Sequence, residues 1–218
     1  MKILRPRALL FDWDNTLVDT WDTIRAALNT ALEAMGHTPW TPEETRLRVR
    51  ASARDTFPAL FGDRADEATA IFYRAFESQH LQTLREREGA GAMLRHLAGD
   101  GSLYMAVVSN KNGHLLRREA EHIGWSGYFS SLVGANDATR DKPAAEAVTL
   151  ALSKSGLPAG PDVWFVGDTD IDMACAVTSG CLPVLLRPDA PAKGEFPGAE
   201  PRMYVDSCTA FLDLMRAL

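Results

Sequence analysis

Short apolar runs alternate with helix-forming stretches over most of the chain. Five runs have the length and composition of buried strands, at residues 8–11, 104–108, 132–133, 163–166 and 183–186. Three helices are predicted after the later runs, at 144–155, 172–179 and 209–218. Pro143 would lie in the first turn of the first of these helices. Strands that alternate with helices predict an α/β fold with a doubly wound, Rossmann-like core around a mostly parallel sheet.

A long insertion interrupts this alternation between the first strand and residue 104. Thr41, Pro42 and Glu44 have the arrangement of a helix start with a capping box. We expect an α-helical cap domain at 19–88, inserted into a core domain made of 1–18 and 89–218. Its apolar residues recur at helical spacings, in two stripes: Ile24, Leu28, Leu32 and Met35, then Ile71, Phe72, Ala75 and Phe76.

Composition and charge exclude several classes of protein. The 218 residues are 46% hydrophobic and 24% charged, which is typical of a globular chain. A formal net charge of −6 argues against a nucleic-acid partner, and no apolar run approaches the roughly 20 residues that cross a bilayer. The three cysteines form no CxxC pair, and an odd number of thiols argues against a disulfide framework, so we expect a cytoplasmic protein. Acids at 12 and 14 interrupt the N-terminal apolar stretch, so we expect no export signal.

The first candidate site follows the first strand, in the sequence FDWDNT of residues 11–16. Alternation along a strand sends the side chains of Asp12 and Asp14 to the same side. Two converging carboxylates repel each other unless a cation neutralises them, and Mg²⁺ prefers such oxygen ligands. The pair therefore indicates a magnesium site, while acids that only cap a strand end are the alternative interpretation.

A second acidic segment repeats this arrangement. The strand at 163–166 runs into Gly167 and Asp168, and Asp172 lies one helical turn further on. Beside the first strand, Asp168 would complete an oxygen shell and Asp172 would orient neighbouring groups. Acids that suit the dipole of a helix N-terminus would give the same pattern.

Two weaker signals lie between these segments. Ser109 and Asn110 follow the strand at 104–108, and Lys142 precedes a predicted helix. Alone, such a serine is usually a turn residue and such a lysine is usually solvated. Ligands of open α/β sheets bind beyond the carboxyl ends of the strands, however, and every candidate falls there. The common position predicts one site.

With these motifs in this order, the chain resembles phosphatases of the haloacid dehalogenase superfamily that carry a helical cap after the first strand, such as phosphoglycolate phosphatase. The resemblance covers essentially the whole chain. It implies a phosphoric monoester hydrolase acting on a small-molecule phosphate ester. The motifs are Asp12-x-Asp14-x-Thr16, the strand ending in Ser109, Lys142 before a helix, and Gly167-Asp168-x-x-x-Asp172.

The resemblance also implies a role for each motif residue. Asp12 would attack phosphorus, and Asp14 would protonate the leaving alcohol and then activate water. Mg²⁺ would be held by Asp12, the backbone carbonyl of Asp14 and Asp168, with Asp172 behind them. The remaining assignments are Thr16 for positioning Asp14, Ser109 and Lys142 for the phosphoryl oxygens, and Asn110 as a further substrate contact.

Two residues depart from the usual family pattern. Asn15 stands where close relatives have glycine, and asparagine tolerates a left-handed backbone better than most residues, so we expect the turn to survive. Trp13 is bulkier than the usual occupant, and the sequence offers no physical reason for it.

The predicted cap carries candidate specificity residues. Arg46, Arg50 and Arg54 are spaced four residues apart and would share one face if a single helix continued through them. Their guanidinium groups suit a carboxylate or a second phosphate, so Arg50 and Arg54 are candidate substrate contacts. A solvated face paired with neighbouring acids is the commoner meaning of such a stripe.

Two other functions stay open at this point. A phosphomutase of the β-phosphoglucomutase kind would share the first-motif carboxylates but return the phosphoryl group to a sugar. A non-catalytic binding or regulatory protein could retain the fold, although loss of a motif residue would favour it and none is missing. The core motifs recognise a phosphoryl group, so they specify neither the rest of the substrate nor the oligomeric state.

Overall fold

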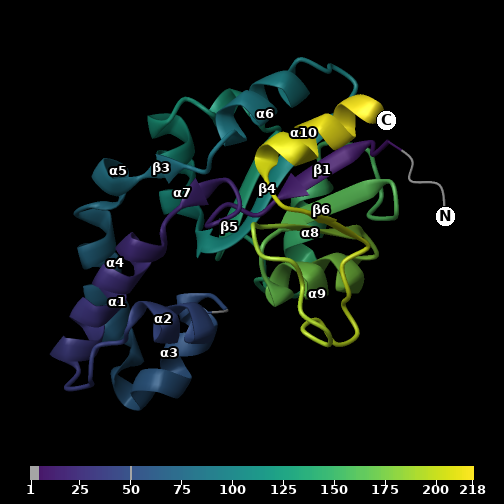
Figure 1. Ribbon diagram of the computed structural model, residues 1–218. Coiled ribbons are helices and arrows are strands. Elements are labelled where there is room, and N and C mark those ends of the chain that lie inside the picture. The colour runs from purple at the N-terminus through teal and green to yellow at the C-terminus, as the bar shows by residue number, and fades with distance from the viewer. Residues whose placement is uncertain (1–4, 50) are drawn as a thin grey trace. The chain divides into compact units, whose positions relative to one another are not determined.

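The computed structural model describes residues 5–49 and 51–218 (Figure 1). The chain divides into two compact units: one contains the described residues up to Val18 together with Glu86–Leu218, and the other is Asp19–Arg85. The backbone N–H of Arg87 donates to the carbonyl of Leu17 at 2.8 Å, which ties this part of the chain to the first unit. The helical unit therefore ends at Arg85 rather than at residue 88.

The larger unit is built on a six-stranded parallel sheet with the strand order β5-β4-β1-β6-β7-β8. Five of its strands contain the apolar runs identified in the sequence, which confirms the doubly wound α/β core. The sequence did not predict β8, because three residues are too few to show a period. The strands are β1 (Ala8–Phe11), β4 (Tyr104–Asn112), β5 (Ser131–Ala135), β6 (Val163–Gly167), β7 (Leu182–Leu186) and β8 (Met203–Val205).

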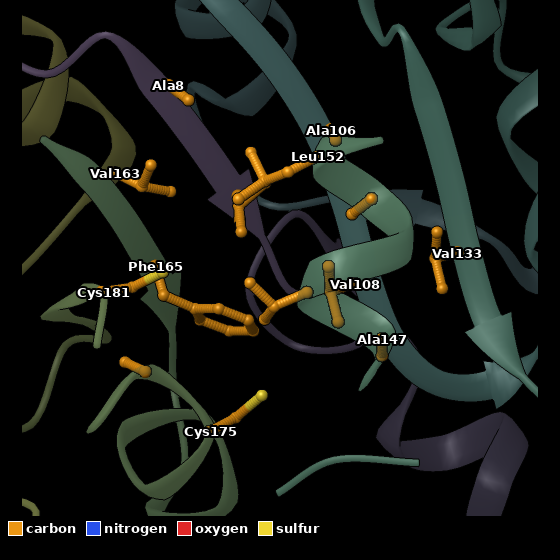
Figure 2. Packing of buried hydrophobic residues seen from close by; sticks show 14 residues of the cluster. Ala8, Ala106, Val108, Val133, Ala147, Leu152, Val163, Phe165, Cys175 and Cys181 are labelled. Carbon is orange, nitrogen blue, oxygen red and sulfur yellow. The ribbon is translucent and has the colours of Figure 1, made fainter. Parts of the chain in front are cut away.

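Helices cover both faces of this sheet (Figure 1). On one face, α8 (Glu146–Leu152) and α9 (Asp170–Ser179) pack against Ala8 and Leu10 of β1 in a core that also contains Phe165 (Figure 2). On the other face, the ring of Phe11 meets that of Phe211 with centroids 6.0 Å apart. Alternate residues of β1 thus face opposite layers, as the pleat of a strand requires. This second layer contains α6 (Ala90–Ala98), α7 (Gly113–His122), the short η2 (Ser126–Tyr128) and α10 (Cys208–Ala217).

One predicted helix start is wrong. The helix α8 begins at Glu146, so Pro143 precedes the helix instead of occupying its first turn. Residues 141–144 form a turn, in which the N–H of Ala144 donates to the carbonyl of Asp141 at 3.0 Å. Within the described residues, no helix combines the length and apolarity that a membrane span requires.

The smaller unit is helical, with its own apolar core of Leu28, Leu32, Trp40, Phe57, Phe61 and Ala68. The expected capping box is present, since Thr41 Oγ1 accepts from the N–H of Glu44 and the N–H of Thr41 donates to Glu44 Oε2. Where the chain passes between the units, β2 (Val18–Asp19) pairs with β3 (Arg85–Glu86). The helices are α1 (Trp21–Ala34), α2 (Pro42–Arg48), α3 (Ala53–Phe61), η1 (Gly62–Arg64), α4 (Ala65–Glu77) and α5 (His80–Thr83).

The arginines of this unit do not share one helical face. The helix α2 ends at Arg48, and α3 begins after Ser52, so Arg46 and Arg54 belong to different helices. Ser52 is the N-cap of α3, where its carbonyl accepts from the N–H groups of Asp55 and Thr56 at 3.1 and 3.0 Å. Arg50 lies outside the described residues. The predicted stripe is therefore wrong as a continuous surface.

Candidate active site

Asp12 stands directly after β1, at the carboxyl end of a central strand of the sheet. Its backbone N–H donates to the carbonyl of Val166 at 2.8 Å, which extends the pairing of β1 with β6 and fixes the start of the loop. The side chain of Asp12 is only 8% exposed. Burial raises the pKa of Asp12 to about 6, although the nearby ammonium of Lys142 acts in the opposite direction.

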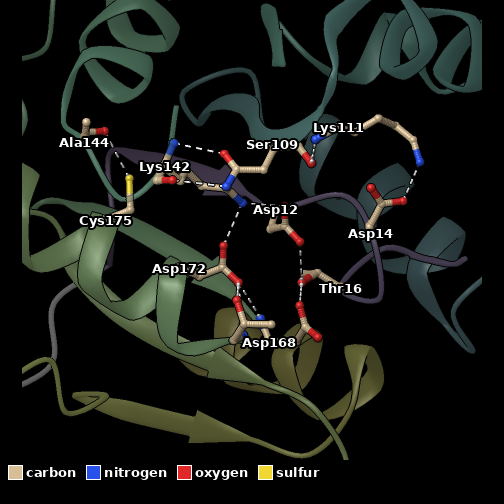
Figure 3. A network of polar contacts seen from close by, with 12 residues as sticks. Asp12, Asp14, Thr16, Ser109, Lys111, Lys142, Ala144, Asp168, Asp172 and Cys175 are labelled. Atoms are coloured by element: carbon tan, nitrogen blue, oxygen red, sulfur yellow. Dashed lines mark hydrogen bonds and ion pairs between the residues drawn. The ribbon is translucent and has the colours of Figure 1, made fainter. Parts of the chain in front are cut away.

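Lys142 lies between two of the site's carboxylates (Figure 3). Its Nζ is 2.6 Å from Asp12 Oδ1 and 2.7 Å from Asp172 Oδ1. Burial alone would lower the pKa of Lys142, but the charges of Asp12 and Asp172 raise it overall. The ammonium is therefore a fixed positive charge beside the candidate nucleophile.

Asn110 holds the backbone of Lys142. Its side-chain Nδ2 donates to the carbonyl of Lys142 at 3.1 Å, and its Oδ1 accepts from the N–H of Lys142 at 2.9 Å. Both ends of the amide are thus used within the protein. The side chain of Asn110 thus fixes the backbone of Lys142, and its contact with substrate stays a prediction.

Ser109 comes from β4, whose residues 104–107 pair with β1. The register of β4 with β5 shifts between Val108 and Asn112, so the strand is irregular where Ser109 lies. Ser109 is buried, and its Oγ accepts from the N–H of Lys111 at 3.3 Å. The parallel pairing brings Ser109 to the same edge of the sheet as Asp12.

Asp172 is held at the start of α9. Its Oδ2 accepts hydrogen bonds from the N–H groups of Asp168 and Thr169 and from the Thr169 hydroxyl, at 3.2, 3.0 and 2.7 Å. A Cβ at Gly167 would lie 2.4 Å from the Cβ of Asp172. Only glycine therefore lets the carboxylate sit this close to the end of β6.

Thr16 contacts a different residue from the one expected. Its hydroxyl lies 3.1 Å from Asp168 Oδ1 and 3.4 Å from Asp12 Oδ2, whereas the family resemblance implied that it would position Asp14. The loop turns back after Trp13, whose carbonyl accepts from the N–H groups of Leu17 and Val18. This turn places Thr16 over the acidic cluster.

We call Asp12, Lys142, Asp168 and Asp172 the Asp12 cluster. Oxygens of its three carboxylates lie within 4.8 Å of one another, against a single ammonium group. Burial and the charges of Asp172 and Asp12 raise the pKa of Asp168 well above its usual range. A divalent cation with oxygen ligands would relieve this repulsion, so the donor set fits Mg²⁺. Asp12 and Asp168 suit direct coordination better than Asp172, whose two oxygens already accept four hydrogen bonds.

Asp14 faces a separate set of partners (Figure 3). Its Oδ1 lies 2.5 Å from Lys111 Nζ, which also lies 3.2 Å from Glu119 Oε2. The side chains of Lys111 and Glu119 are 4% and 0% exposed, whereas that of Asp14 is 18% exposed. Of the two carboxylates that contact Lys111, only that of Asp14 is therefore exposed to solvent to an appreciable extent. The sequence analysis predicted neither Lys111 nor Glu119 as a partner of Asp14. Lys111 could have been recognised as a candidate site residue, because it lies two residues after Ser109.

Trp13 now has a physical explanation. Its indole N–H donates to Glu119 Oε2 at 2.7 Å, and its ring packs edge-on against Trp125 with centroids 5.8 Å apart. We call Trp13, Asp14, Lys111 and Glu119 the Asp14 network.

Asn15 has a φ of 66°, which confirms the expected left-handed turn. Its N–H donates to the carbonyl of Val18.

Comparisons with known proteins agree with this geometry. A profile of the haloacid dehalogenase-like hydrolase family matches residues 9–185. The chain is 27% identical over 191 residues to a phosphoglycolate phosphatase of Pseudomonas fluorescens, covering 83% of this chain and 69% of the relative. It is 28% identical over 197 residues to a phosphoglycolate phosphatase of Chromobacterium violaceum, covering 84% and 86%. A Clostridium perfringens protein named provisionally as a pyrophosphatase is 24% identical, covering 97% and 98%.

Solved structures with the same fold include two hydrolases. A haloacid dehalogenase superfamily hydrolase from Ehrlichia chaffeensis superposes with a TM-score of 0.69 at 28% identity, covering 100% of this chain and 99% of the other. A hydrolase of the haloacid dehalogenase-like family from Streptococcus pneumoniae gives 0.82 at 18% identity, covering 96% and 98%. At that lower identity, the second likeness concerns the fold alone.

Proposed function

The chain belongs to the haloacid dehalogenase-like hydrolase family, and from that premise we propose that it is a Mg²⁺-dependent phosphatase. It cleaves small-molecule phosphate monoesters through an aspartyl phosphate on Asp12. One observation carries this proposal: a buried carboxylate at the end of β1 lies 2.6 Å from Lys142 Nζ, within a cluster of three acids. Relatives named phosphoglycolate phosphatase support a small, negatively charged phosphate ester as the substrate.

The reaction proceeds by two displacements at phosphorus. In the first, an oxygen of Asp12 forms a bond to phosphorus as the ester P–O bond breaks, and Asp14 gives its proton to the leaving alcohol. In the second, Asp14 removes a proton from water, whose oxygen attacks the aspartyl phosphate. The bond between phosphorus and Asp12 breaks, and inorganic phosphate leaves. Asp14 suits this proton transfer because it is more exposed than Asp12.

The groups around Asp12 hold the phosphoryl oxygens and the cation. Lys142 and Ser109 bind phosphoryl oxygens, and Asn110 fixes Lys142 through its backbone. Asp12, the backbone carbonyl of Asp14 and Asp168 would hold Mg²⁺, with Asp172 behind them. When bound, the cation neutralises the charge that otherwise repels the phosphate dianion from three acids.

Release of phosphate from p-nitrophenyl phosphate tests this function, measured with Mg²⁺, with EDTA, and with Asp12→Asn. We expect turnover that requires the metal and disappears in Asp12→Asn, with a phosphorylated wild-type protein trapped by acid quenching. Asp213→Asn, an exposed aspartate paired with Arg216, is the matched control and should retain full activity. Metal-independent turnover, or turnover that survives Asp12→Asn, contradicts the proposal.

Natural substrates are then screened with the same protein. Phosphoglycolate, pyrophosphate and sugar phosphates cover the chemistry suggested by the relatives and by the phosphomutase alternative. Free inorganic phosphate as the only phosphorus product supports hydrolysis, whereas an isomeric sugar phosphate indicates a mutase. We also propose a cytoplasmic location, because the three cysteines are buried as free thiols.

A further inference from the structure

Asp14 must change roles during the proposed reaction, so its carboxylate has to be held in place without being sequestered. Thr16, the neighbour expected to do this, is turned toward Asp12 and Asp168. The ammonium of Lys111 contacts the carboxylate of Asp14, at 2.5 Å between Nζ and Oδ1. We propose that Lys111 is the positioning residue of the acid/base, and that Glu119 and Trp13 hold Lys111 for this purpose. The inference rests on the proposed function.

The contacts form a continuous buried chain. The indole of Trp13 donates to Glu119 Oε2, the same oxygen lies 3.2 Å from Lys111 Nζ, and Lys111 reaches Asp14 Oδ1. Trp13 and Asp14 are consecutive residues, so the chain of contacts begins and ends on the same loop. Glu119 comes from α7 and Lys111 from β4, which anchors the loop to two elements of the core.

Burial makes this arrangement stiff. Trp13 and Glu119 are fully buried, and only the carboxylate end of the network has appreciable exposure. Lys111 Nζ lies between two carboxylates, 2.5 Å from Asp14 Oδ1 and 3.2 Å from Glu119 Oε2. An ammonium that bonds two carboxylates in a dry environment restricts the rotamers of all three side chains.

This placement predicts an effect that depends on the leaving group. An alkyl ester needs a proton from Asp14 as its P–O bond breaks, whereas p-nitrophenolate leaves readily without one. Loosening Asp14 should therefore slow the first displacement only for the alkyl ester. The second displacement needs Asp14 as a base for either substrate, so the aspartyl phosphate should accumulate when p-nitrophenyl phosphate is used.

Lys111→Met tests the inference, with glycerol phosphate and p-nitrophenyl phosphate as the two substrates. We expect kcat/KM to fall about 30-fold for glycerol phosphate and less than about 3-fold for p-nitrophenyl phosphate, since a mispositioned acid loses only part of the roughly 10²–10⁴-fold that general acid–base catalysis contributes. A burst of p-nitrophenol should precede slow turnover, and the phosphorylated protein should be detectable by mass after acid quenching. Arg117→Gln on the same helix α7, which removes an exposed pair with Asp137, is the control and should show neither effect.

A cycle with Asp14→Asn separates positioning from a general structural role. If Lys111 acts through Asp14, adding Lys111→Met to Asp14→Asn should change the rate less than about 2-fold, because the two losses are not additive. An equal loss on both esters, or the full Lys111→Met loss in the Asp14→Asn background, would overturn the inference.

A second variant and an unfolding measurement test whether the effect of Lys111→Met comes from misfolding. Lys111→Met leaves Glu119 without its ammonium partner, so Lys111→Met/Glu119→Gln removes both charges and should show the same leaving-group dependence. Thermal unfolding checks that each variant is folded. If Asp12→Asn turns over as fast as the wild-type protein, the proposed function is contradicted. If Asp12→Asn is inactive but a folded Lys111→Met has wild-type rates on both esters, only this inference is contradicted.

Discussion

Asp12 and Asp14 are two residues apart on one loop, yet their surroundings differ in kind. The Asp12 cluster sets three carboxylates against one lysine, and its acids converge on a common point. In the Asp14 network, Lys111 bridges two carboxylates, and one of these also receives the indole N–H of Trp13. The first arrangement suits a cation and a phosphoryl group, and the second holds a single acid at a partly exposed position. Tertiary partners, more than position in the motif, give the two aspartates different electrostatic surroundings.

The largest difference should appear when each aspartate loses its charge. Asp14→Asn is expected to lower kcat by about 10³-fold, within the range for general acid–base catalysis, while leaving the nucleophile intact. With p-nitrophenyl phosphate it should accumulate phosphorylated protein, whereas Asp12→Asn should form none. Acid quenching followed by mass spectrometry measures both. An Asp14→Asn protein that turns over normally would remove the functional contrast between the two aspartates.

The two buried lysines should also separate the clusters. Lys142→Met is expected to lower kcat/KM by about 10²-fold for p-nitrophenyl phosphate and glycerol phosphate alike, because it removes a donor to the phosphoryl group. Lys111→Met should affect mainly glycerol phosphate. Steady-state kinetics on both esters provide the test, with the exposed Lys154→Met as control. The same leaving-group dependence in both variants would contradict separate roles.

Mg²⁺ should stabilise the protein through the Asp12 cluster. At a concentration 100 times its Kd, a ligand of the folded state adds about 2.7 kcal/mol. For a chain of this size that corresponds to a rise of about 5–10 °C in Tm. Asp168→Asn should lose most of this rise, whereas Glu119→Gln in the Asp14 network should keep it. Scanning calorimetry with Mg²⁺ and with EDTA distinguishes these outcomes.

The affinity for Mg²⁺ should depend on pH in one direction. Because burial raises the pKa of Asp12 to about 6, the metal-free carboxyl is protonated below that pH, and the cation must displace the proton. Apparent affinity should therefore rise as the pH increases through about 6 and level off above it. Titration of the metal by calorimetry at several pH values measures this, and affinity that falls over the same range would contradict it.

A smaller effect should follow from the glycine beneath Asp172. Gly167→Ala places a methyl group 2.4 Å from the Cβ of Asp172 and is expected to cost about 1–3 kcal/mol, as overpacking does. The displaced carboxylate should also weaken the hold on Lys142. Gly160→Ala is the matched control, since a Cβ there meets no atom within 4 Å, and it should leave stability nearly unchanged. Denaturant unfolding compares the two variants.

Local chemistry made much of this protein readable from its sequence. Apolar runs gave five of the six core strands because buried parallel strands need continuous apolar residues. The capping box at Thr41 and the left-handed Asn15 were predictable because each depends on a few neighbouring residues. The motif acids could be placed on one edge, since the carboxyl ends of parallel strands meet there.

Tertiary structure alone decided which side chains meet at that edge. Lys111 and Asp14 are 97 positions apart, and Trp13 and Glu119 are 106 apart, so no local period links them. Because of the turn after Trp13, the hydroxyl of Thr16 contacts Asp168 and not the expected Asp14. The end of α2 before Val49 separates arginines whose spacing fitted a single helix. A sequence pattern specifies which edge or face a residue occupies. Packing between distant elements then selects its rotamer and its partner, because a buried charge is costly unless it is paired, hydrogen-bonded or bound to a cation.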